Sequence, residues 1–106
     1  MDPSEYVRHV LDAYRAAPGT CGAIRKPDRA FALHLFARGV SLAVIENAFV
    51  LASARRLARP AGATPLGVIR SLAYFSPVID EVLGLRVDDA YFQHLRQRLA
   101  RFLQKP

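Results

Sequence analysis

The sequence predicts an all-α protein: a compact bundle of about five helices that forms a single domain over residues 1–106. Three observations support this prediction. Apolar residues recur at helical spacing, helix starts carry a capping residue next to a proline, and no run alternates apolar with polar residues long enough for a strand. A hydrophobic content of 52% in 106 residues also supplies one core without disulfides or metals.

The first two helices are expected in the N-terminal third of the chain. Asp2 before Pro3 is a favourable N-cap for the first helix, which Pro18-Gly19 should end. Its apolar face carries Tyr6, Val7, Val10, Leu11 and Tyr14. Asp28 is expected to cap the second helix, and Gly39 to end it as a residue that tolerates a left-handed conformation.

A tight turn at 38–42, which begins Arg-Gly-Val-Ser, joins the second helix to the third, with Ser41 as the expected cap. This sequence is typical of a helix-turn-helix-like corner. A recognition helix needs Arg, Asn, Gln or Lys in its first two turns, whereas residues 42–56 offer only Glu46 and Asn47 there. A buried helical hairpin is therefore favoured, with this nearly all-apolar helix at the centre of the bundle.

Two more helices are expected in the C-terminal half. The fourth should begin at Thr64-Pro65 and end at Gly84, with Pro77 kinking it or dividing it at Phe75-Ser76. One of the aspartates at 88–89 should cap the fifth. The inward residues are expected to be Val68, Leu72, Phe75, Ile79 and Val82 in the fourth helix, and Phe92, Leu95, Leu99 and Phe102 in the fifth.

The sequence argues against several classes of function. Cys21 is the only cysteine, and the three histidines lack metal-ligand spacing, so no disulfide, metal or cofactor is expected. Neighbouring carboxylates such as Asp80-Glu81 point about 100° apart on a helix, which does not suit paired acid and base catalysis, so we do not expect an enzyme. Neither a signal peptide nor a membrane span is recognisable, which favours a cytoplasmic protein without membrane contact.

The net charge of +6 favours an acidic partner, of which nucleic acid, and DNA in particular, is the expected one. In the fifth helix a basic stripe that could follow a phosphate backbone consists of His94, Arg98, Arg101 and Lys105. The alternative is a solvated face of snorkelling arginines. Further candidate contacts flank the start of the second helix and the end of the third: Arg25, Lys26, Arg29, Arg55 and Arg56. The helix dipole explains cations at the end of the third helix, but not those at the start of the second.

Two segments carry a family resemblance: 45–52, Ile-Glu-Asn-Ala-Phe-Val-Leu-Ala, and 69–82, Ile-Arg-Ser-Leu-Ala-Tyr-Phe-Ser-Pro-Val-Ile-Asp-Glu-Val. Residues 40–83 resemble the C-terminal domain of DnaD-type primosomal and phage replication proteins. The positions that match that family's Tyr-x-x-x-Ile-x-x-x-Trp pattern are Tyr74, Val78 and Val82, with valine in place of the tryptophan. The resemblance implies a small helical domain that contacts single- or double-stranded DNA and helps to load replication machinery.

Together these features predict a small, basic DNA-binding accessory protein of a mobile element or phage, acting in replication or regulation through arginine contacts with phosphates. The alternative is a protein-interaction or homodimerisation module, in which Tyr74 and Phe75 contact another chain. The high apolar content of so short a chain favours that alternative. The two functions are compatible, since many small DNA-binding proteins are homo-oligomers.

Overall fold

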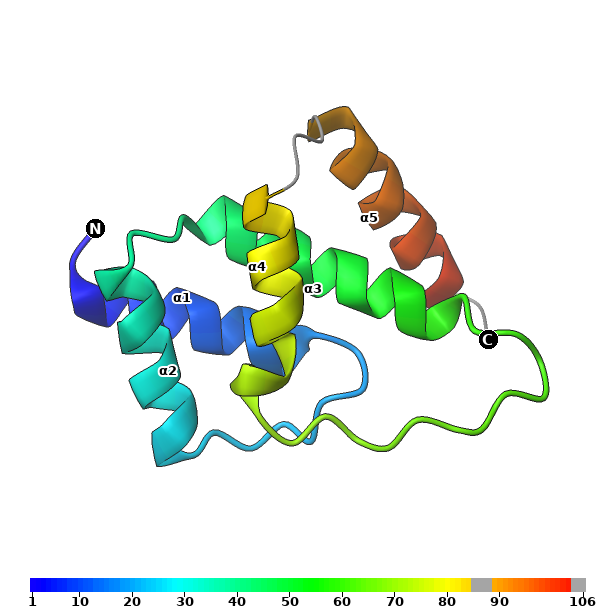
Figure 1. The fold of residues 1–106 in the computed structure, drawn as a ribbon, viewed down its shortest axis with the longest axis horizontal. Helices are drawn as coiled ribbons and strands as arrows, with labels where there is room; N and C mark the ends of the chain where they lie inside the picture. Colours follow the sequence, from blue (N-terminus) through cyan, green and yellow to red (C-terminus); the bar gives the residue numbers. More distant parts are fainter. Residues whose placement is uncertain (85–88, 104–106) are drawn as a thin grey trace.

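The computed structural model describes residues 1–84 and 89–103, and every regular element within these ranges is a helix. The elements are α1 (Pro3–Ala16), α2 (Lys26–Ala37), α3 (Leu42–Leu57), a short 3₁₀ helix η1 (Leu72–Phe75), α4 (Ser76–Gly84) and α5 (Asp89–Leu103). The predicted all-α class with about five helices is confirmed. Figure 1 shows α4 crossing α3 nearer its start, whereas α5 lies over α3 toward its C-terminal end.

The core is built around α3, which packs against α1, α4, α5 and η1. Its buried residues are Ile45, Ala48, Phe49, Leu51, Ala52 and Ser53. Phe75 of η1 is fully enclosed, and its ring meets those of Phe49 and Tyr14 edge-on, with centroids 4.6 and 6.2 Å away. The nearly all-apolar sequence of α3 therefore occupies the central position that it predicts.

Phe75→Ala is expected to lower the free energy of unfolding by about 3–5 kcal/mol, because it empties the centre of this aromatic cluster. Leu33→Ala is the control, since the Leu33 side chain of α2 is 49% exposed, and it should cost clearly less. Urea denaturation followed by circular dichroism measures both values. Equal losses in the two variants would show that Phe75 is not the core residue that its enclosure indicates.

The start of α2 differs from the prediction. Asp28 is not the N-cap: the helix begins at Lys26, and Asp28 is its third residue. The Asp28 carboxylate reaches back and accepts a hydrogen bond from the backbone N–H of Arg25 over 2.9 Å. It therefore satisfies a free donor at the start of the helix from inside the first turn, where Pro27 is tolerated because its missing N–H is not needed.

The fourth helix does not begin at Thr64-Pro65. Residues 58–71 form a long loop, and Ile69 pairs with the loop after α1: its N–H donates to the Gly19 carbonyl (2.7 Å) and its carbonyl accepts from Cys21 (2.9 Å). A backbone used in this way cannot form a helix. Val68, predicted to face inward, is consequently 54% exposed.

The predicted division at Phe75-Ser76 is confirmed. The 3₁₀ helix η1 ends at Phe75 and α4 begins at Ser76, so that Pro77 lies in the first turn of α4. Proline is compatible with that turn because its missing N–H would have no partner in the helix.

The structure does not confirm a helix-turn-helix-like corner at 38–42. The turn itself is as expected: Gly39 has a φ of +75°, and the Ser41 hydroxyl accepts from the Val44 N–H over 3.2 Å. However, α2 packs on α1 and η1, whereas α3 is surrounded by α1, α4, α5 and η1. The Asn47 side chain, moreover, accepts a hydrogen bond from Arg96 of α5. These contacts place α3 inside the bundle, as expected for a buried helical hairpin.

The last turn of α5 also departs from the prediction. Phe92 is buried, and Leu95 and Leu99 are partly buried, but Phe102 faces outward. The reason is that α5 packs chiefly on α3, which leaves Phe102 at the rim of the groove between the two helices. Of the two aspartates proposed as its cap, Asp89 is the first residue of α5, and position 88 lies outside the described residues.

Candidate nucleic-acid interface

The outer face of α5 carries a cluster of basic side chains. His94, Arg98 and Arg101 are all exposed, and together with Phe102 they line one shallow hollow. No carboxylate pairs with them among residues 1–84 and 89–103. Lys105, the fourth member of the predicted stripe, lies outside the described residues. We call His94, Arg98 and Arg101 the α5 basic face.

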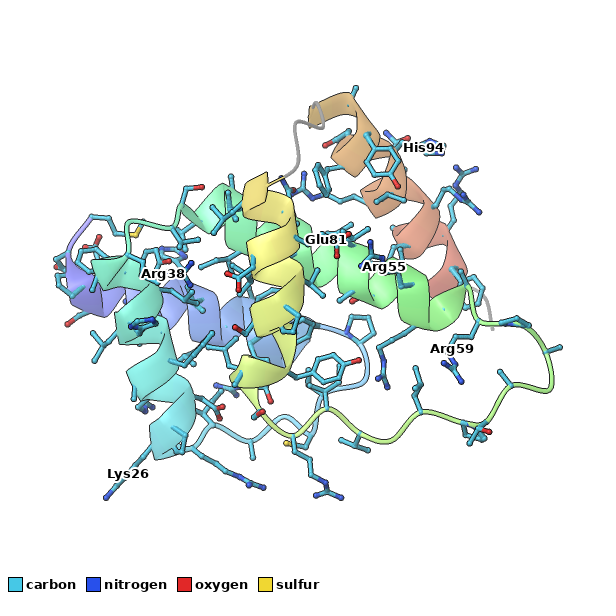
Figure 2. All side chains as sticks on the ribbon, viewed as in Figure 1. Lys26, Arg38, Arg55, Arg59, Glu81 and His94 are labelled. Atoms are coloured by element: carbon cyan, nitrogen blue, oxygen red, sulfur yellow. The ribbon has the colours of Figure 1, made fainter. Side chains whose placement is uncertain are left out.

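Arg55 borders this face but has a partner of its own. Both terminal nitrogens of its guanidinium donate to the carboxylate of Glu81 in α4, with Nη1 2.8 Å from Oε2 (Figure 2). This hydrogen bonding lowers the pKa of the Glu81 carboxyl and raises that of Arg55. Arg55 and Arg98 both line a groove of about 330 Å³ between α3 and α5. The charge of Arg55 is thus largely offset before any ligand arrives.

Arg56 contacts the 58–71 loop. Its Nη2 donates to the Gly67 carbonyl (2.9 Å) and its Nη1 to the Tyr74 hydroxyl (3.2 Å), while the guanidinium lies 5.9 Å from the centre of the Tyr74 ring. Arg59 donates to the Thr64 carbonyl of the same loop over 2.7 Å. These contacts hold the loop against the end of α3. In the sequence, the arginines are recognisable only as cations at a helix end, so their contacts with the loop could not be predicted.

The cations at the start of α2 form a separate group. Arg25, Lys26 and Arg29 are exposed, and no carboxylate pairs with their side chains in the described part of the chain. Figure 2 places Lys26 and His94 at opposite ends of the molecule. The predicted phosphate contacts therefore do not form one surface, and a short segment of nucleic acid would reach only one of the two groups.

The prediction that Tyr74 and Phe75 form an interaction surface is wrong for Phe75. Tyr74 is 44% exposed, but Phe75 is enclosed in the core and unavailable to another chain. Consecutive residues of a 3₁₀ helix point about 120° apart, so only one of the two side chains can face the core. Val78 is partly buried and Val82 is buried, which leaves Tyr74 as the accessible position of the pattern that resembles the DnaD family.

Sequence reasoning missed the structural role of Asp28. The Asp28 side chain is 2% exposed, and its Oδ1 accepts from the backbone N–H of Leu72 over 2.9 Å. Since Oδ2 accepts from Arg25, one carboxylate joins the starts of α2 and η1. The Lys-Pro-Asp sequence signals a helix start, but it contains nothing that points to a partner 44 residues away.

Within the described ranges, no group of histidine, cysteine and acidic residues could hold a metal ion. The helices described there include none with the length and apolar character needed to cross a membrane. Comparison of the chain with protein-family models, curated proteins and solved structures finds no match. The function has to be inferred from the charges, exposure and contacts of this chain.

Proposed function

We propose that this protein is a non-enzymatic accessory protein that binds DNA through the α5 basic face. The supporting observation is that its three basic side chains share one exposed face and that no carboxylate offsets them in the described residues. Two arginines on other elements are instead paired with carboxylates of α4: Arg38 with Asp80, and Arg55 with Glu81. Unpaired guanidinium groups are well suited to phosphate oxygens.

The geometry favours contacts with the backbone rather than with bases. His94 and Arg101 are seven residues apart, which corresponds to about 10 Å along the helix axis. That length spans roughly three nucleotide steps at about 3.4 Å per step. The α5 basic face is therefore expected to neutralise phosphates with little preference for sequence. The DnaD resemblance of residues 40–83, with its link to replication in a phage or mobile element, belongs to the same proposal, and Tyr74 is the exposed one of its three pattern positions.

Fluorescence anisotropy with labelled DNA and RNA tests this function. Single- and double-stranded oligonucleotides of scrambled sequence are titrated with the full chain at about 50 and 200 mM salt. Binding to DNA that weakens steeply with salt is the expected result. If no nucleic acid binds at the lower salt concentration, the proposal is wrong.

Homodimerisation is a second candidate function, and a specific observation favours it. Tyr91, Phe102 and Leu103 are each about half exposed along α5, and two of them, Tyr91 and Phe102, line the groove between α5 and α3. Large apolar side chains grouped on one helix are typical of a contact with another chain.

We expect the protein to self-associate through this part of α5. Sedimentation equilibrium at a concentration on the order of 100 µM should yield about twice the monomer mass of 11.7 kDa. Phe102→Ser should shift the equilibrium to monomer, whereas Leu33→Ser, at an exposed position of α2, should not. A monomer mass at every concentration would contradict the prediction.

A further inference from the structure

A pocket of about 340 Å³ lies between the C-terminal end of α3 and the 58–71 loop. Two arginines, Arg56 and Arg59, are among the residues that line it. Most of the remaining wall is apolar and comes from Pro18, Leu57, Pro60, Ala63, Pro65 and Leu66. A cavity of this size, apolar with a few charged groups at one side, is typical of sites for small molecules.

Arg56 is a partly buried cation with only neutral partners. The side-chain bonds described above join it to a carbonyl and a tyrosine hydroxyl, and no carboxylate pairs with it within the described residues. A guanidinium has five N–H donors, so these two bonds leave others available. Partial removal of a cation from water is unfavourable unless an anion lies nearby.

The guanidinium of Arg56 is also held in place. It packs against Gly19, which has a φ of +86°, and a Cβ added at Gly19 would lie 3.1 Å from Nη2. The Gly19 backbone is bonded to Ile69 of the long loop, as described above. Glycine thus provides both the backbone conformation and the space that this arrangement requires. A donor group fixed before a ligand arrives loses little freedom when the ligand binds.

Arg59 adds a second cation. It follows Arg56 by three residues, just beyond the end of α3, and lines the same pocket. The segments that form the pocket supply no counter-charge, because neither residues 17–22 nor residues 58–71 contain an aspartate or glutamate. Both arginines thus face a mostly apolar pocket to which the surrounding loops contribute no anion.

We propose that this pocket binds a small organic anion. The oxygens of its carboxylate or phosphate group accept hydrogen bonds from Arg56 and Arg59, and its compact apolar body lies against Pro60, Ala63 and Leu66. The site is separate from the α5 basic face, so the proposal does not depend on DNA binding. Guanidinium groups are the side chains best matched to such oxyanions, because their planar fork donates two parallel hydrogen bonds.

Titrations of the full chain, followed by two-dimensional NMR of backbone amides and arginine side-chain Nε–H groups, test the proposal. The probes are hexanoate, phenyl phosphate and inorganic phosphate. Hexanoate and phenyl phosphate compare a carboxylate with a phosphate, and inorganic phosphate shows how tightly the oxyanion binds without an apolar body. Saturable shifts are expected at Arg56, Arg59, Gly19 and Gly67. At least one organic probe should bind about tenfold more tightly than inorganic phosphate, since it also fills the apolar part of the pocket.

Two variants distinguish a pocket from general attraction to a basic protein. Ala63→Leu fills the apolar part and keeps both arginines, so it should weaken the tighter organic probe about tenfold while inorganic phosphate is unaffected. Arg59→Gln should weaken all three probes, and Arg8→Gln, at an exposed position of α1, should weaken none. Unsaturable shifts, shifts of equal size on α5, or unchanged affinities in both Ala63→Leu and Arg59→Gln would overturn the proposal.

Discussion

Asp28→Ala is expected to lower the free energy of unfolding by about 3–5 kcal/mol, a large part of the stability of a domain of this size. The carboxylate is buried, and it accepts one backbone hydrogen bond at the start of α2 and another at the start of η1. Hydrogen bonds to a charged group each contribute about 1.5–3 kcal/mol, and removal of the acceptor leaves the N–H groups of Arg25 and Leu72 without this partner.

Urea denaturation of two further variants separates this role from a general effect of charge. Asp12→Ala removes a carboxylate from an exposed position of α1 and should change stability by less than about 0.5 kcal/mol. Asp28→Asn keeps the shape but turns one acceptor into a donor that faces an N–H, so it should also be strongly destabilising. An Asp28→Ala protein as stable as Asp12→Ala would show that the carboxylate does not join the two helix starts.

Replacement of both Arg98 and Arg101 by glutamine should weaken DNA binding by about tenfold or more near 0.1 M salt. It should also reduce the slope of log affinity against log salt by about two, one for each phosphate contact removed. The loss should be the same for unrelated sequences, because phosphate contacts carry no sequence information. The fold should persist, since both side chains are exposed and glutamine has a high helix propensity.

The matched control replaces Arg8 and Arg15, two exposed arginines of α1, by glutamine, because this removes the same charge from another helix. Anisotropy titrations across salt should show a nearly unchanged slope for this control. If both double variants lose affinity equally, DNA is attracted by the net charge as a whole and not by the α5 basic face. If only the control loses affinity, the binding face has been assigned to the wrong helix.

Helices whose ends carry local signals were predictable from the sequence. Asp2 caps α1 by accepting from the Glu5 N–H over 2.8 Å, Ser41 caps α3, and Gly39 lies beyond the end of α2 with a positive φ. Pro77 likewise located the boundary between η1 and α4. These features were predictable because each depends on residues within one turn of the chain, where backbone hydrogen bonds and allowed dihedral angles act.

The course of the long loop and the contacts of the charged side chains depend on how distant segments pack in the folded chain. Thr64-Pro65 has the composition of a helix start, yet the pairing of Ile69 with Gly19 and Cys21 holds this region outside a helix. Among the predicted phosphate contacts, Arg55 pairs with a residue of α4 and Arg56 with the loop. A long charged side chain contacts whichever groups lie near it in the folded molecule. Which distant segments lie near each other depends on the packing of the whole core, and the local sequence does not encode that packing.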